Sequence, residues 1–154
     1  MNKVFYGKTN SLNLHLLIAL SRTTKKVHNR SASIFSAGGL TTAQFSVLDV
    51  LYHKGSQSIN QITQLVLSTG GNMTVVINNM EKHGWITRCA HPGDKRTTLI
   101  SITEDAKRLV EQIFPEHLKD LEICFSALSE EEKNTLISLL KKAGSQDYEN
   151  EKCY

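Results

Sequence analysis

Residues 41 to 102 have the sequence TTAQFSVLDVLYHKGSQSINQITQLVLSTGGNMTVVINNMEKHGWITRCAHPGDKRTTLISI, which contains three short helical patterns followed by two strand patterns. The first helical pattern starts at Thr41, which can form a capping box with Gln44. Its apolar face ends at Gly55, and glycine is common just after a helix. Ser58 starts a second pattern with the same capping chemistry. The sequence therefore predicts two consecutive short helices.

The third helical pattern has two different sides. The apolar side, expected to face the core, consists of Met73, Val76, Ile77 and Met80. The outer side has small and polar residues, namely Asn72, Thr74, Val75, Asn78, Asn79 and Lys82. Two helices joined by a short glycine-containing turn, the second with a small and polar outer face, indicate a helix-turn-helix motif whose second helix fits a DNA major groove.

Two strand patterns follow the helices. Residues 85 to 89 and 97 to 102 are rich in β-branched and aromatic side chains, which predicts a pair of strands. Residues 90 to 96 lie between them and form a basic turn that ends in Arg96. Such a loop can follow the phosphate backbone and insert an arginine into the adjacent minor groove, and Asp94 can orient that arginine. The patterns together predict a winged helix-turn-helix.

Four ordered stretches carry a family resemblance. They are Leu40-Thr41…Gln44-Phe45…Val47-Leu48, Thr74-Val75-Val76…Met80-Glu81-Lys82-His83-Gly84, His91-Pro92-Gly93-Asp94-Lys95-Arg96 and Ile102-Thr103-Glu104. The set resembles the MarR-type transcriptional regulators over residues 10 to 142. The resemblance implies a homodimeric winged-helix protein, in most members a repressor, which small phenolic or oxidising compounds release from DNA in many cases. Asn78 departs from the family, which commonly has an acidic residue there, and this leaves the base preference open.

These patterns predict a DNA-binding surface on the third helix and the wing. Backbone N–H groups at the start of that helix suit phosphate contact, and small side chains there allow close approach. The predicted DNA contacts are Gly70, Gly71, Asn72, Thr74, Val75, Asn78, Lys82, Arg88, Asp94, Lys95 and Arg96. Arg88 fits a phosphate contact and an ordinary surface position equally well.

Helical patterns flank the winged region on both sides. Before it, an apolar stripe runs along one long helix through Leu16, Leu20, Val27 and Ile34. After it, Thr103 can cap a helix in which Pro115 predicts a kink or break near residues 111 to 115. A last helix, before which Ser129 and Glu132 can form a third capping box, ends at Gly144. These helices can form a two-fold dimer interface, although they can also simply cap the monomer core.

The fold class predicted is therefore mainly α, with a two-stranded β-wing, in one compact domain of 154 residues. We expect an N-terminal dimerisation helix in residues 1–39, a winged helix-turn-helix DNA-binding region in 40–103, C-terminal dimerisation helices in 104–144 and a flexible tail in 145–154.

The net charge of +3 is unevenly distributed. Residues 1–39 carry a net charge of +6, residues 40–103 carry +2 and residues 104–154 carry −5. A basic portion and an acidic far end favour oriented approach to nucleic acid. No apolar run is long enough for a transmembrane helix, and we expect no signal peptide, so the protein is predicted to be cytoplasmic.

The sequence offers several candidates for the signal that releases the protein from DNA. His15, His28 and Phe45 are candidates for an effector crevice between the dimer helices and the winged region. Cys89, next to Arg88, can be an oxidant sensor or, more commonly for a strand cysteine, a small buried hydrophobic residue. The spacing of His83, Cys89 and His91 fits no familiar zinc motif, so no metal or other cofactor is expected.

The sequence has no nucleophile–base pair, P-loop or dinucleotide motif, so an enzyme is not expected. We expect a homodimeric, sequence-specific regulator of double-stranded DNA, a repressor that binds a pseudo-palindromic operator and that a small effector, for example a phenolic one, releases. The alternatives are a metal- or thiol-redox-sensing regulator and a winged-helix module for protein–protein contact. The polar outer face of the third helix argues against the second alternative.

Overall fold

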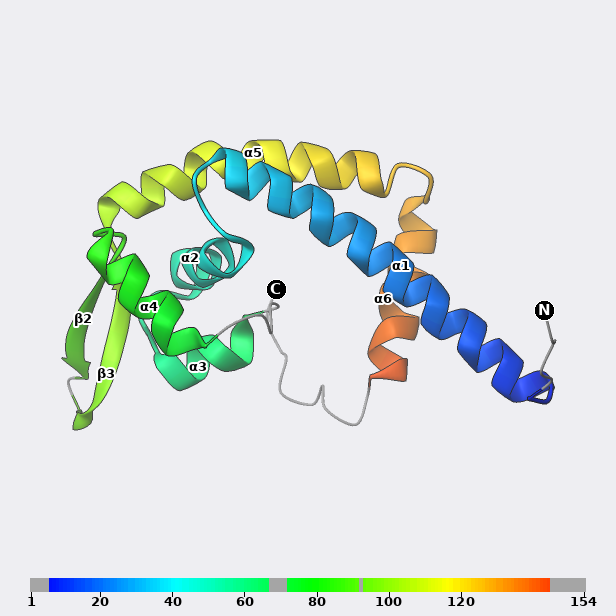
Figure 1. The fold of residues 1–154 in the computed structure, drawn as a ribbon, viewed down its shortest axis with the longest axis horizontal. Helices are drawn as coiled ribbons and strands as arrows, with labels where there is room; N and C mark the ends of the chain where they lie inside the picture. Colours follow the sequence, from blue (N-terminus) through cyan, green and yellow to red (C-terminus); the bar gives the residue numbers. More distant parts are fainter. Residues whose placement is uncertain (1–5, 67–71, 92, 145–154) are drawn as a thin grey trace. The chain divides into compact units, whose positions relative to one another are not determined.

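The computed structural model describes residues 6–66, 72–91 and 93–144 (Figure 1). The contacts divide the chain into two compact units, Met1–Asp120 and Leu121–Tyr154. The predicted DNA contacts Gly70 and Gly71, and the predicted tail 145–154, lie outside the described residues.

The described residues form helices with one small sheet. In chain order the elements are α1 (Lys8–Ala37), α2 (Thr42–Lys54), β1 (Gln57–Ser58), α3 (Ile59–Leu65), α4 (Met73–Lys82), β2 (Ile86–His91), β3 (Asp94–Ile102), α5 (Glu104–Cys124) and α6 (Glu130–Ala143). The predicted mainly α fold with a β-wing is confirmed.

Three helices begin with the capping boxes that the sequence predicts. At the start of α2, the Thr41 hydroxyl accepts a hydrogen bond from the Gln44 backbone N–H at 3.2 Å, and the Gln44 side chain accepts one from the Thr41 N–H at 2.8 Å. The same reciprocal pair occurs between Ser58 and Gln61 before α3, and between Ser129 and Glu132 before α6. Each box satisfies two backbone N–H groups that the helix itself leaves without partners.

Helix α2 lies at the centre of the core of the first unit. It contacts α1, α3, α4 and β3. Its buried residues are Phe45, Val47, Leu48, Val50 and Leu51. They pack in one cluster with buried residues from the neighbouring elements, among them Ile62, Ile77, Met80, Ile86 and Ile100. Because α4 contributes Ile77 and Met80 to this cluster, its opposite side is left facing solvent.

The sheet is antiparallel and has the strand order β1-β3-β2. The sequence predicts two strands, and the third, β1, is only two residues long and pairs with β3 at Ile100 and Leu99. A segment this short has no detectable period, so only its pairing partner defines it. The strands of the hairpin are also longer than predicted, since β2 extends to His91 and β3 begins at Asp94.

The end of α1 packs closely on α5. Gly39 has a φ of +80°, which other residue types rarely adopt, so it ends the helix. Gly38 allows close packing for a different reason, because a Cβ atom there would lie 2.4 Å from Cδ1 of Ile113. A side chain at residue 38 would therefore require the Ile113 side chain to move.

Pro115 lies inside α5, which runs from Glu104 to Cys124 as one helix. The sequence predicts a kink or a break near this proline, and the break is therefore wrong. A proline inside a helix costs roughly 3 kcal/mol, because one backbone hydrogen bond is lost. Buried residues on the preceding turns, Val110 and Ile113, hold the helix against the core, and this packing outweighs the local cost.

Candidate nucleic-acid interface

Helix α4 presents the side that the sequence assigns to DNA. The exposed residues on this side are Asn72, Thr74, Val75, Asn78, Asn79 and Lys82. Asn72 also has a structural role, because its side-chain oxygen accepts a hydrogen bond from the Thr74 N–H at 3.0 Å and caps the helix. Val75 is 52% exposed and is the one large apolar side chain on this side among the described residues. Methyl groups of this kind can contact the methyl group of thymine.

Arg88 of β2 is attached to α4 by two side chains. Its Nε lies 3.0 Å from Oε2 of Glu81, which is an ion pair, and its Nη2 donates a hydrogen bond to Oδ1 of Asn78. The structure thus joins two of the predicted DNA contacts directly. Sequence analysis missed the role of Glu81, and its position three residues after Asn78 on one helix face was the available signal.

The hairpin beyond Arg88 carries the basic turn. Asp94, Lys95 and Arg96 are the first three residues of β3, and the backbone of Asp94 pairs with that of His91. The register shifts between Ala90 and His91, which marks an irregularity near the end of the hairpin. The wing residues therefore lie on an extended strand and not in a long loop.

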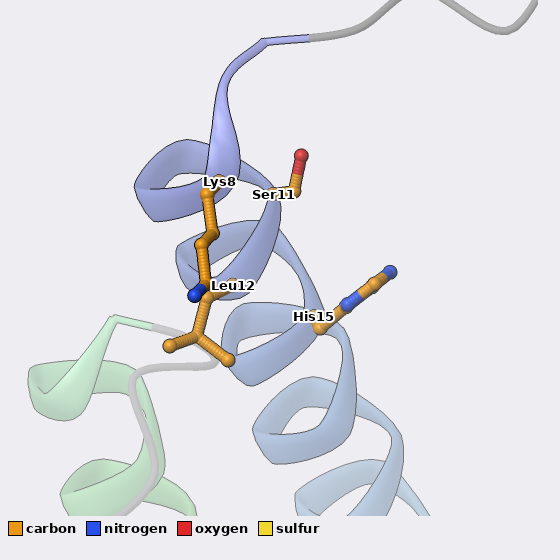
Figure 2. Close-up of a pocket in the computed structure, with 4 residues that line it drawn as sticks. All are labelled: Lys8, Ser11, Leu12 and His15. Carbon is orange, nitrogen blue, oxygen red and sulfur yellow. The ribbon is translucent and has the colours of Figure 1, made fainter.

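The three candidate effector residues do not come together within one chain. His15 and His28 are both exposed on α1, and 13 residues of helix separate them by about 20 Å. His15 lines a shallow, open depression with Lys8, Ser11 and Leu12, and Figure 2 shows that all four side chains come from α1. Phe45 is instead buried in the core.

The surroundings of Phe45 form an aromatic–histidine cluster, which consists of Phe35, Phe45, Phe114 and His117 from α1, α2 and α5. The rings of Phe35 and Phe45 stack with centroids 3.9 Å apart, and His117 approaches Phe35 edge-on at 5.0 Å. Phe114 lies 6.3 Å from Phe45. Sequence analysis missed this cluster, because its members are far apart in the chain and only packing brings them together.

His117 is electrostatically unusual within this cluster. Its Nδ1 atom is buried and has no hydrogen-bond partner among the described residues. Burial lowers the pKa of His117, and the carboxylates of Asp120 and Asp49 oppose the shift only in part. Burial likewise raises the pKa of Asp49, against the opposing influence of His53 and His117. His117 therefore tends to remain neutral, with a ring nitrogen available to a hydrogen-bonding group.

Polar contacts surround the cluster. His53 lies with its Nδ1 3.1 Å from Oδ1 of Asp49. The Tyr52 hydroxyl donates a hydrogen bond to Oε1 of Glu111 at 3.0 Å, and this bond to a carboxylate raises the pKa of Tyr52. The first contact lies within α2, while the second joins α2 to α5, since Glu111 belongs to α5.

Cys89 is exposed, so the expectation of a buried strand cysteine is wrong. Alternation along β2 places it on the face opposite to buried Ile86, with its Sγ 4.0 Å from the Ser101 hydroxyl.

Within the described ranges, no three His, Cys, Asp or Glu residues are grouped to hold a metal ion, and the side chain of His91 lies outside them. No single helix in these ranges is long and apolar enough to cross a membrane, and α1 and α2 pass that test only as a pair bent by 83°.

The sequence was compared with known families and proteins. The pattern of the MarR family matches residues 40–98, which span α2, α3, α4 and almost the whole hairpin. The HTH-type transcriptional regulator MhqR of Bacillus subtilis (strain 168) is 36% identical over 131 residues, which are 85% of this chain and 90% of MhqR. The chain belongs to the MarR family.

Solved structures agree with this membership at the level of the fold. A mutant MarR from E. coli complexed with operator DNA has a TM-score of 0.76 at 24% identity, and the match covers 89% of this MarR-family chain and 98% of that one. The organohalide-sensing regulator RdhR in its 2,4-dichlorophenol-bound form has a TM-score of 0.76 at 17% identity, covering 96% and 90% of the two chains.

The comparisons support the class of protein predicted from the sequence. This MarR-family chain is a DNA-binding transcriptional regulator with a winged-helix fold, and its relatives are regulators and not enzymes.

Proposed function

We propose that this regulator is a cytoplasmic homodimeric repressor that binds a pseudo-palindromic operator through α4 and the wing. The observation that carries the proposal is the small, polar and exposed side of α4, which lies next to a hairpin ending in basic residues. A helix of this kind fits the major groove, while a basic strand end fits the phosphate backbone and the minor groove.

In this proposal the predicted contact residues have different roles in DNA binding. Thr74, Val75 and Asn78 face the bases from the exposed side of α4. Lys82, Lys95 and Arg96 add positive charge toward phosphates and the minor groove. Asn72 caps α4, so its contribution to binding is to present the helix N-terminus, together with the preceding Gly70 and Gly71.

Exposed apolar side chains support the proposed dimer. The N-terminal half of α1 has large apolar residues that are 42–67% exposed, namely Leu12, Leu14, Leu16, Leu17 and Ile18. Helix α6 has no buried residue at all, and its apolar residues Leu136, Ile137, Leu139 and Leu140 are 40–57% exposed. So many exposed large apolar side chains on both terminal segments are typical of helices that another chain covers.

A small, phenolic effector fits the aromatic–histidine cluster better than the predicted trio of His15, His28 and Phe45. Of that trio only Phe45 belongs to the cluster. Phe35 and Phe45 are already stacked on each other, so a flat ring would pack on the outside of this pair, where the buried Nδ1 of His117 can bond a hydroxyl group. RdhR, a structural neighbour, was solved with 2,4-dichlorophenol. A chlorinated or simple phenol is therefore the first compound to test.

The main experiment measures binding to the DNA upstream of the protein's own gene. Fluorescence anisotropy should show tighter binding to an operator in that DNA than to a scrambled duplex, and in vitro transcription from the same DNA should fall as protein is added. Sedimentation should give a dimer at micromolar concentration. Equal affinity for both duplexes would refute operator recognition, and a monomer would refute the dimer.

Cys89 keeps one second candidate open, which is a regulator triggered by thiol oxidation. The observation that favours it is the exposure of this thiol on β2, since oxidants reach exposed thiols first. Treating the wild type and a Cys89→Ser variant with peroxide distinguishes the two triggers. Loss of DNA binding in the wild type alone would support oxidation, and loss in neither would support the small-molecule effector.

A further inference from the structure

Arg88 is held against α4 by two side chains that lie one turn apart. Asn78 and Glu81 are three residues apart on α4, so their side chains are neighbours on the helix surface. The Nε of Arg88 pairs with Glu81 at 3.0 Å, and its Nη2 donates to Oδ1 of Asn78. Two different nitrogens of one planar group are engaged, which fixes the guanidinium relative to both side chains.

The strand that carries Arg88 is anchored in the core. Side chains alternate along a strand, so Arg88 lies on the same face of β2 as Ile86, which is 2% exposed. Across the ladder Arg88 pairs with Ile100, which is fully buried. The backbone at Arg88 therefore belongs to the rigid base of the hairpin and not to its tip.

The chemistry of the contact determines how Asn78 is oriented. A guanidinium group has only donors, so the atom of Asn78 that it contacts must be the carbonyl oxygen. The amino group of Asn78 is then directed away from Arg88. Asn78 is exposed, and its Nδ2 donates to no residue that the structure describes. What remains available on this side chain is a pair of N–H donors.

We propose that Arg88 determines the base preference of α4 by holding Asn78 in this donor-presenting orientation. This inference rests on the proposed function, in which α4 enters the major groove. An unconstrained asparagine pairs with adenine by accepting from N6 and donating to N7. With its oxygen held by Arg88, Asn78 instead suits bases that present only acceptors, namely N7 and O6 of guanine or O4 of thymine. Glu81 is a positioning residue, because its charge keeps Arg88 in place.

The test measures base preference and not affinity alone. Operators are selected from a random duplex library with the full-length wild type, and every single-base variant of the selected site is then measured by competition. We expect one position in each half-site to prefer guanine or thymine by about 5- to 100-fold over adenine, and Asn78→Ala should abolish this preference.

Two further variants test whether Arg88 orients the Asn78 side chain or only contacts the DNA itself. Arg88→Met keeps an unbranched apolar stem and removes the guanidinium donors, so Asn78 can turn and the preference at that position should move toward adenine. Asn78→Asp keeps the contact with Arg88 and removes the N–H donors, so the preference for guanine or thymine should be lost. The control is Arg108→Met, which breaks the exposed ion pair with Asp105 on α5 and should change no base preference.

Each outcome has one meaning. If the wild type selects an operator but Arg88→Met lowers affinity equally for all bases, Arg88 is a phosphate contact and the inference is wrong, while the proposed function stands. The same conclusion follows if Asn78→Asp retains the preference, a result that does not depend on the folding of the Arg88 variant. If the wild type selects no sequence, the proposed function itself fails.

Discussion

Thr103 connects the hairpin to α5, and replacing it with valine should weaken that junction measurably. Its hydroxyl donates to the Gly84 carbonyl at 2.9 Å and lies 3.2 Å from the Trp85 carbonyl. The same oxygen accepts a hydrogen bond from the Ala106 N–H at 3.3 Å, which caps α5 as the sequence predicts. Valine has nearly the same shape and removes only these hydrogen bonds.

The expected loss follows from the bonds removed. Loss of a helix N-cap costs roughly 0.5–2 kcal/mol. Loss of the hydrogen bond to the Gly84 carbonyl adds about 0.5–1.5 kcal/mol. The Trp85 carbonyl keeps a partner, because the Thr103 backbone N–H also bonds it at 3.0 Å. We expect a total of about 2 kcal/mol, which lowers the melting temperature of a chain of this size by about 4–8 °C.

Thermal unfolding followed by circular dichroism at one fixed protein concentration measures this change, since the stability of a dimer depends on concentration. The matched control is Thr87→Val on β2, an exposed position whose hydroxyl bonds no residue that the structure describes. The control should change the melting temperature little. If Thr103→Val lowered it by no more than the control does, the hydroxyl would not stabilise the junction and the reasoning would be refuted.

Three other outcomes are expected. The operator affinity of the proposed dimer should depend steeply on salt, with a log–log slope of about −5 or steeper, and a flat response would argue against phosphate contact. Arg96→Ala should weaken binding most at sites with A·T-rich flanks, and Asp94→Ala should partly mimic it if the aspartate orients the arginine; stronger binding by the Asp94 variant would contradict that role. Burial lowers the pKa of His117, so the unfolded chain binds the proton more readily and stability should fall as the pH drops through the unfolded value of 6.5. In His117→Phe this part of the urea-midpoint curve, between pH 7.5 and 6.0, should be flatter, and a loss equal to that of the wild type would show that His117 is not its cause.

The sequence by itself predicted what local chemistry controls. Capping boxes such as Thr41 with Gln44 involve residues three apart, so their hydrogen bonds form wherever a helix starts. The exposed and buried sides of α4 follow in the same way from a period of 3.6 residues. For this reason the winged helix-turn-helix and the exposed side of α4 could be predicted from the sequence alone.

The tertiary structure alone decided the features that join distant residues. Pro115 remains inside one helix because buried neighbours outweigh its local cost, and Gly38 lets the side chain of Ile113 of α5 lie against it. The aromatic–histidine cluster brings together three helices that no sequence period connects. The bond from Arg88 to Asn78 is of the same kind: ten residues and a change from helix to strand separate the two, and only the packing of β2 against α4 gives one side chain control over the other.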